Sequence, residues 1–296
     1  MKYAIVVDSA SSLTKDEAEK LGWYFLPLHI TINNIEYEDG VQITSKNLFE
    51  KFTLDKEVKT SSVNLGEAEN LFIELSKEYD KIFVYPISKH LSGCCQSLTI
   101  LAEQFPKVRV IQSVEIVELI LLDLFWLENQ IKKDETKIDE YIKFIENGGW
   151  RKSVTLIPKY NKYLVKGGRL HPAAALVAKL LNIVPLIAFE DGQLLKEGVG
   201  RIFKKSILKN IEKKKEFLKA NETNEFLVAY LHSNATEDDQ RDIQNKFEEV
   251  FGEKVIKRFI SPVVSIHTGP ESYVGIVMEI DKETKNKFLD YIKEKQ

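Results

Sequence analysis

The sequence predicts a protein of two α/β parts: a parallel-sheet α/β domain over residues 1–149, then an α+β domain with a mixed, partly antiparallel sheet over residues 150–296. Three observations lead to this fold class. In the first half, short apolar runs alternate with helical stretches, as in sheets whose parallel strands are joined by helices. Asn147-Gly148-Gly149 is a helix stop suited to a domain boundary. In the second half, Asp191-Gly192 is a two-residue hairpin signal, which implies antiparallel strands.

The first half opens with an apolar strand over Tyr3–Val7. Thr14 and Glu17 have the spacing of a capping box, which predicts a helix to about Leu21. Asn33-Asn34 predicts a tight turn between strands over 25–32 and 35–37. The other expected elements are, in order, a short helix capped by Thr44 and Ser45 that ends near Phe52, a helix over 65–79, a strand over 81–87, a helix from Gly93, a strand over 108–111, and helices over 114–127 and 135–146.

The second half has a different pattern, in which hairpins mix with helices. Short strand-like runs lie over 153–156, 184–189, 193–198, 226–232, 255–259 and 275–280. Helical stretches lie near 173–181, 201–219 and 237–251. This mixture favours a partly antiparallel sheet over a second parallel one.

Composition excludes several classes of protein. The apolar fraction of 44% and charged fraction of 29% are those of an ordinary globular protein. The 42 basic and 45 acidic residues are intermixed, which argues against a nucleic-acid or membrane-surface binder. We interpret the Lys213–Lys215 run as a solvated helix face.

The sequence also predicts a cytoplasmic protein without stable membrane insertion. Met1 leads directly into a strand, without a charged and then apolar leader. The longest apolar stretch, Val117–Leu127, contains Glu118 and Asp123 and is too short to span a bilayer. Adjacent Cys94-Cys95 cannot crosslink distant segments, and we expect small buried side chains near a helix start.

Polar groups follow or precede the predicted elements of the first half at positions where α/β sheets bind ligands. Asp8-Ser9 follows the first strand, Thr60-Ser61-Ser62 precedes a helix, and Ser88 and Ser92-Gly93 follow the central strand. Ser and Thr are also favoured helix caps regardless of function, so helix capping alone is the other interpretation of each group. Ser92-Gly93 is the sharper candidate, because glycine lets a ligand approach the backbone.

Two groups of the second half have the same two interpretations. Lys166-Gly167-Gly168-Arg169 is either a turn or a nest of N–H donors for an anion. His267-Thr268-Gly269-Pro270 is either a structural turn or part of a site. The five histidines show no metal-ligand spacing, and no nucleophile-elbow motif is present, so we expect neither a metal nor another cofactor.

Taken together and in order, these motifs resemble those of the DegV family. The likeness runs over nearly the whole chain and is carried by the following segments: Val7-Asp8-Ser9, Lys59-Thr60-Ser61-Ser62, Ser88 with Leu91–Ser97, Leu164–Arg169, Asn182–Leu186 with Asp191-Gly192, Gly200-Arg201 with Lys204-Lys205, and His267–Pro270.

The resemblance implies a carrier that buries a long-chain fatty acid between and within its two domains. In such proteins, residues matching Thr60 or Ser61, Ser92 and His267 bind the carboxylate, with Gly93 and Thr268 beside them. The residue matching Arg169 lies near the head group and faces the partner. That partner is an ATP-dependent fatty-acid kinase, which phosphorylates the carboxylate, so the resemblance implies a chain without catalytic residues of its own.

This chain departs from the family pattern at several positions. Gln112 stands where an aspartate is usual, Leu119 where a glycine is common, and Tyr273 in a segment of small residues. With Phe125, these bulky side chains are expected to reshape the acyl tunnel. Two other functions stay open: a lipid sensor or storage protein without a kinase, and an acyl hydrolase with Ser92 as nucleophile and His267 as base.

Overall fold

The computed structural model describes residues 1–53, 56–178, 183–219 and 225–294. Contacts between residues divide the chain into two compact units. The first unit is Met1–Gly149 with Ser261–Val263, and the second is Trp150–Ile260 with Val264–Gln296. The fold class is confirmed, because the first unit contains a parallel sheet and the second a mixed one.

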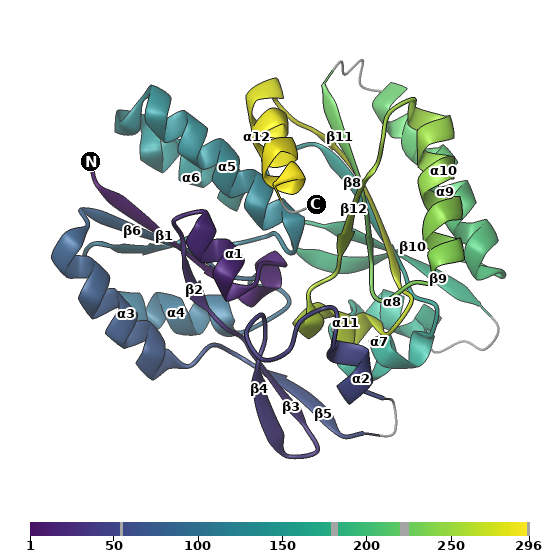
Figure 1. Ribbon diagram of the computed structural model, residues 1–296, viewed down its shortest axis with the longest axis horizontal. Helices are drawn as coiled ribbons and strands as arrows, with labels where there is room; N and C mark the ends of the chain where they lie inside the picture. The colour runs from purple at the N-terminus through teal and green to yellow at the C-terminus, as the bar shows by residue number, and fades with distance from the viewer. Residues whose placement is uncertain (54–55, 179–182, 220–224, 295–296) are drawn as a thin grey trace. The chain divides into compact units, whose positions relative to one another are not determined.

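A four-stranded parallel sheet forms the centre of the first unit, in the order β2-β1-β6-β7 (Figure 1). Its strands are β1 (Tyr3–Asp8), β2 (Tyr24–Leu26), β6 (Lys81–Tyr85) and β7 (Val108–Val110). Helices α3 (Leu65–Glu78) and α4 (Cys94–Ala102) lie on one face, and α5 (Glu118–Lys133) and α6 (Ile138–Glu146) lie on the other. The short elements η1 (Ser9–Ser11), α1 (Lys15–Lys20), α2 (Leu48–Lys51) and η2 (Glu135–Lys137) complete the helices described in this unit.

A second sheet of the first unit has three antiparallel strands in the order β4-β3-β5. They are β3 (His29–Ile32), β4 (Ile35–Glu38) and β5 (Val58–Ser61). Asn33 and Asn34 join β3 to β4 with φ of 49° and 64°, which confirms the predicted two-residue turn. The capping box is confirmed as well, since Thr14 and Glu17 each accept a hydrogen bond from the other's backbone N–H.

The second unit contains a six-stranded mixed sheet in the order β10-β9-β8-β13-β11-β12. Every neighbouring pair is antiparallel except β11 and β12. The strands are β8 (Lys152–Ile157), β9 (Val184–Glu190), β10 (Gln193–Gly200), β11 (Phe226–His232), β12 (Ile256–Phe259) and β13 (Tyr273–Glu279). Asp191 and Gly192 form the predicted hairpin turn, with φ of 48° and 76°.

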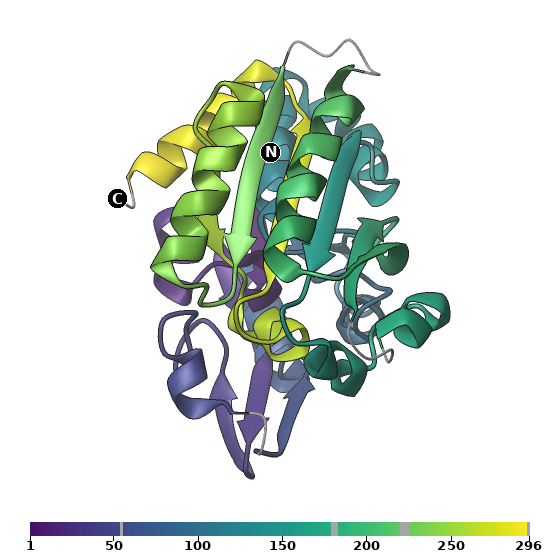
Figure 2. The same cartoon turned by 90° about the vertical axis from the view of Figure 1, so that its right-hand side faces the viewer.

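Helices α9 (Phe203–Lys219) and α10 (Glu237–Phe251) lie side by side over one face of this sheet, as Figures 1 and 2 show. They pack against Ile157, Tyr230 and Tyr273 in the core of the unit. The other helices are α7 (Asn161–Gly167), α8 (Pro172–Ala178) and α12 (Lys282–Lys293), together with α11 (Pro262–Thr268), which belongs to this unit from Val264 onward. The end of the helix predicted near 173–181 lies outside the described residues.

The sequence did not predict β5, α7, α11 or α12, and four expectations were wrong in detail. Asn47, rather than Thr44 or Ser45, directly precedes α2. Helix α5 begins at Glu118 rather than near Val114, because Val117 has φ of 52°, outside the helical range. The strand predicted over 25–32 is instead two strands, β2 and β3, which belong to different sheets.

The interpretation of Lys213–Lys215 as a solvated run is wrong for Lys214, whose side chain is only 2% exposed. It continues the buried stripe of Ile207, Ile211 and Leu218 along α9.

Candidate functional site

Buried polar groups gather around Asp8 at the carboxyl end of β1 in the first unit. Its carboxylate accepts hydrogen bonds from the backbone N–H groups of Ile87 (2.7 Å) and Ala10 (3.0 Å). The Cys94 thiol at the start of α4 lies 3.9 Å from the same carboxylate. Burial raises the pKa of Asp8 to about 7, although the two backbone N–H groups oppose the shift. This end of the sheet therefore holds a carboxyl group close to its neutral state.

The start of α4 also lies against the segment that follows β5. The Ser62 side chain and the Val63 backbone N–H are close enough to the Cys94 sulfur to lower its pKa slightly. Burial nevertheless dominates and raises that pKa to about 12. Both cysteines are buried, as expected for small residues at a helix start. The geometry thus brings together the ends of β1, β5 and the α4 loop within the first unit.

Ser92 and Gly93 lie in the loop that leads into α4. The Ser92 hydroxyl accepts a hydrogen bond from the Cys94 backbone N–H at 3.2 Å, so it takes part in capping the helix. A side chain added at Gly93 would meet nothing within 4 Å. Packing therefore does not require glycine at this position, and the open space beside it leaves the backbone accessible to a ligand.

Thr60 and Ser61 are adjacent on β5, so their side chains point to opposite faces of the small sheet. Thr60 is half-buried and pairs with Ile30, whereas Ser61 is exposed and pairs with His29. Asn64 caps α3 through its side-chain oxygen, so capping does not explain these two hydroxyls. His29, which the sequence did not single out, is buried with its Nδ1 3.5 Å from the Glu36 carboxylate.

In the second unit, His267 near the end of α11 packs directly against the end of α7. A side chain at Gly167 would place its Cβ 2.9 Å from the His267 Nδ1 atom, so only glycine allows this approach. The Arg169 guanidinium donates a hydrogen bond to the Gly167 carbonyl. Burial, together with the nearby positive charge of Arg169, lowers the pKa of His267 to about 4. The imidazole is therefore neutral near pH 7 and offers one N–H donor.

The two candidate motifs of the second unit are thus brought together. Gly168, with φ of 68°, ends α7 and donates its N–H to the Leu164 carbonyl, so the turn interpretation of the paired glycines is confirmed. Thr268 is 3% exposed, and its hydroxyl has no hydrogen-bond partner among the described residues. His267 and Arg169, with Thr268 next to His267 in the chain, are called the imidazole cluster below.

The residues that differ from the usual family pattern make hydrogen bonds or are buried within their own unit. Gln112 donates hydrogen bonds to the Thr99 hydroxyl (3.1 Å) and the Val110 carbonyl (3.4 Å). Leu119 and Phe125 are buried on α5 in the first unit. Tyr273 is buried in the second unit and stacks on Tyr230, with ring centroids 5.6 Å apart.

Within the described ranges, no group of three or more His, Cys, Asp or Glu side chains is arranged to hold a metal ion. No helix among these residues is both long and apolar enough to cross a membrane.

A parallel-sheet unit followed by a mixed-sheet unit, each with its own small polar cluster, defines a two-part α/β protein. The family model described as "Uncharacterised protein, DegV family" matches residues 2–281. The chain belongs to the DegV family.

Named relatives are similar over nearly their full lengths. A DegV domain-containing protein of Mycoplasmopsis pulmonis is 37% identical over 98% of this chain and all of its own. One from Clostridium perfringens is 28% identical over 93% of this chain and 98% of its own.

Solved structures show the same fold. A DegV family protein from Thermus thermophilus, described as fatty acid binding, has a TM-score of 0.81 and 22% identity over 95% of this chain and all of its own. DegV from Bacillus subtilis, described as a fatty acid binding protein, has a TM-score of 0.81 and 21% identity over 94% and 99% of the two chains. A stearic acid-binding protein from Eubacterium ventriosum has a TM-score of 0.80 and 21% identity, with 96% and 99% covered.

Proposed function

We propose that this protein binds a long-chain fatty acid, with its carboxylate held by the hydroxyls of Thr60 or Ser61 and Ser92 and by the imidazole N–H of His267. The observation that carries the proposal is the neutral His267, which packs against Gly167 beside the Arg169 charge. A neutral imidazole donates a hydrogen bond without adding a fixed charge, and a nearby guanidinium compensates the charge of the carboxylate. The descriptions of the Thermus, Bacillus and Eubacterium structures support a fatty acid as the ligand.

The energetics of burial are consistent with such a ligand. Each buried methylene contributes about 0.8 kcal/mol, so a long acyl chain supplies on the order of 10 kcal/mol before ordering costs. A carboxylate leaves water only where donors replace its hydration. Two hydroxyls and one imidazole supply three such donors, and Gly93 and Thr268 lie next to them in the sequence. The long-chain fatty acid is therefore the ligand we propose for these residues.

We further propose that the protein presents the carboxylate to an ATP-dependent kinase, which converts it to an acyl phosphate. The exposed Arg169 beside His267 supports this reading, because an exposed guanidinium is available to a partner or to the transferred phosphoryl group. A sensor or storage role would use the same fatty-acid site without the phosphorylation step.

The binding proposal is tested by extracting gently purified protein and measuring retained fatty acids by mass spectrometry. A thermal-shift titration with long-chain fatty acids is the second measurement. We expect a retained fatty acid and a concentration-dependent rise in melting temperature. A lipid-free protein whose melting temperature ignores fatty acids would refute the proposal.

The site is tested by combining Ser92→Ala with His267→Ala. Each lost hydrogen bond to a charged group costs about 1.5–3 kcal/mol, so the double variant should bind fatty acid at least about a hundredfold more weakly. Thr53→Ala and His171→Ala remove an exposed hydroxyl and an exposed imidazole as matched controls, and should change the affinity little. Unchanged affinity in the double variant would refute the site while leaving fatty-acid binding intact.

The kinase step is tested by incubating the lipid-loaded protein with ATP and a bacterial fatty-acid kinase. Acyl phosphate trapped as a hydroxamate is the expected product. Lipid-loaded protein that yields none with a kinase that is active on another DegV protein would favour the sensor or storage role. An ester-hydrolysis assay without ATP tests the hydrolase alternative, and we expect no activity.

A further inference from the structure

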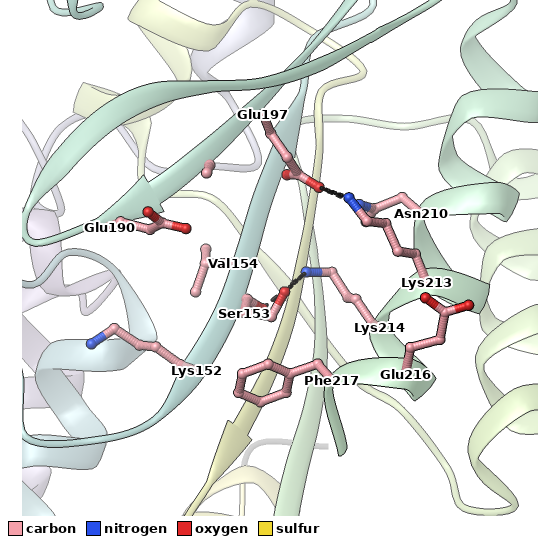
Figure 3. A pocket seen from close by; sticks show the side chains of 11 residues that line it. Lys152, Ser153, Val154, Glu190, Glu197, Asn210, Lys213, Lys214, Glu216 and Phe217 are labelled. Carbon is pink, nitrogen blue, oxygen red and sulfur yellow. Dashed lines mark hydrogen bonds and ion pairs between the residues drawn. The ribbon is translucent and has the colours of Figure 1, made fainter. Parts of the chain in front are cut away.

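The second unit contains a pocket of about 380 Å³ between the sheet and helix α9, separate from the imidazole cluster (Figure 3). Strands β8, β9 and β10 form its floor, and Val154, Ala188 and Phe217 supply apolar walls. Its ionisable lining residues are Lys152, Glu190, Glu197, Lys213, Lys214 and Glu216. The volume lies within the range of small-molecule sites, while the lining is more highly charged than is usual for them, which favours a small polar ligand.

Lys214 is the buried functional group of this pocket. Its ammonium nitrogen lies 2.9 Å from the Ser153 carbonyl oxygen, 3.1 Å from the Ser153 hydroxyl and 3.1 Å from the Thr155 hydroxyl. Figure 3 shows its side chain reaching from α9 toward Ser153 on β8. Three hydrogen-bond partners therefore fix the position of the nitrogen.

The sheet is shaped to accept this lysine. Gly275 on β13 lies opposite Thr155, and a Cβ added there would lie 3.0 Å from the Lys214 Cε atom and 2.0 Å from the Tyr273 hydroxyl. The absence of a side chain at Gly275 thus makes room for the lysine stem and the tyrosine ring. In an ordinary helix-sheet interface an aliphatic residue would stand at the position of Lys214. Packing alone therefore does not account for an amine there, because burying a polar group costs free energy.

Burial lowers the pKa of Lys214 to about 7, and Lys213 lowers it further, while Glu197 opposes both effects. A larger fraction of the Lys214 side chain is therefore free amine near neutral pH than of an exposed lysine. A free amine has a lone pair and can attack a carbonyl carbon.

A proton path connects this nitrogen to a carboxylate. The Thr155 hydroxyl donates to the Glu197 carboxylate at 2.7 Å and accepts from Lys214 and from the Asn210 amide at 3.1 Å. The Asn210 amide also lies 3.5 Å from Glu197, and Lys213 lies 3.7 Å from it. The hydroxyl is thus oriented to pass a proton from the amine to the carboxylate.

We propose that this pocket binds a small aldehyde or ketone and that Lys214 forms an imine with its carbonyl carbon. The nitrogen lone pair forms the C–N bond, and the carbonyl π electrons move to oxygen. The two amine protons leave in turn through Thr155 to Glu197 and are delivered to that oxygen, which departs as water when the C=N bond forms. No oxidant or other reactant is needed.

The test uses the full-length protein with propanal and sodium cyanoborohydride near neutral pH, followed by peptide mass spectrometry. Cyanoborohydride reduces an imine to a stable secondary amine, so each reacting lysine is recorded. Lys214 should be alkylated at least about tenfold faster than its exposed neighbours Lys213 and Lys215, as its larger free-amine fraction requires. In urea the three lysines should react alike.

Glu197→Gln removes the proton acceptor and should slow alkylation of Lys214 by about tenfold, within the range of general acid–base effects. Glu190→Gln is the matched control, since Glu190 lines the same pocket but is not bonded to Thr155. Alkylation of Lys214 no faster than of Lys213 in the folded protein would overturn the proposal. An unchanged rate in the folded Glu197→Gln variant would overturn the assigned proton path.

Discussion

The two units bury ionisable groups of opposite kinds. In the first unit, burial raises the pKa of Asp8 to about 7 and that of Asp39 to about 8. In the second, burial lowers the pKa of Lys214 to about 7 and those of His232 and His267 to about 4. Desolvation is the largest cause in all five cases, and it always favours the neutral form. Among these five groups, the buried carboxyl groups lie in the first unit and the buried amine and imidazoles lie in the second, and burial favours the uncharged form of each.

The largest expected effect comes from removing the buried acid. Asp8→Ala leaves the buried N–H groups of Ile87 and Ala10 without their acceptor, at about 1–3 kcal/mol each. We therefore expect the unfolding free energy of the first unit to fall by about 2–6 kcal/mol. Hydrogen exchange followed separately in peptides of the two units measures this loss. Asp139→Ala, at an exposed carboxylate, is the control.

Lys214→Met is the corresponding change in the second unit. Methionine keeps most of the aliphatic stem and removes the cost of burying a charge, so we expect a smaller loss, within about 2 kcal/mol. A larger loss than that of Asp8→Ala would contradict the expected order, in which the buried acid contributes more to stability than the buried amine.

Opposite pH dependence is the next expected effect. Because the pKa of Asp8 is raised from 3.8 to about 7, its contribution to stability is fully present below pH 3.8 and is lost as the pH rises toward 7. Because the pKa of Lys214 is lowered from 10.5 to about 7, its contribution is fully present above pH 10.5 and is lost as the pH falls toward 7. Each slope is at most about 1.4 kcal/mol per pH unit.

Hydrogen exchange as a function of pH, corrected for the intrinsic exchange rate, measures both slopes in one sample. Asp8→Asn should flatten the acid-side slope of the first unit, and Lys214→Met should flatten the alkaline-side slope of the second. Stability that changes with pH in the same direction in both units would contradict the opposite pKa shifts of Asp8 and Lys214.

The smallest effect concerns the two hairpin turns. Asn34 and Gly192 occupy equivalent positions, with φ of 64° and 76°. Asn34→Gly should stabilise the first unit by about 0.5 kcal/mol, and Gly192→Asn should destabilise the second by a similar amount, since glycine adopts positive φ without steric cost. Melting temperatures of the two variants, which should shift in opposite directions, are sufficient to check this.

Elements with a local chemical signal could be predicted from the sequence. The helix at Thr14 and the hairpins at Asn33-Asn34 and Asp191-Gly192 each depend on side chains next to the element itself. Helices α7 and α11 were missed. Their seven residues show little helical period, and α7 has no side-chain cap of the kind that marks the similarly short α1 at Thr14. Within α11, the apolar run from Pro262 also resembles a strand.

The candidate site could be predicted only in part. The sequence singled out both His267 and Arg169, but their proximity depends on α7 packing against α11, which no local pattern encodes. The burial of Lys214 was missed because a local pattern was misleading. Its two lysine neighbours suggested a solvated run, although its spacing from Ile207 and Ile211 places it on the buried face of α9.

The adjacent glycines at the end of α7 carry two unrelated constraints. Only the backbone conformation favours glycine at position 168, since Gly168 has positive φ and open space around its Cα. At position 167, packing requires glycine, since any side chain would collide with the His267 ring. In a library of variants, position 168 should accept asparagine, whereas position 167 should accept glycine alone. The two adjacent glycines are therefore required for different reasons, Gly168 by the backbone conformation that ends α7 and Gly167 by the close packing of His267.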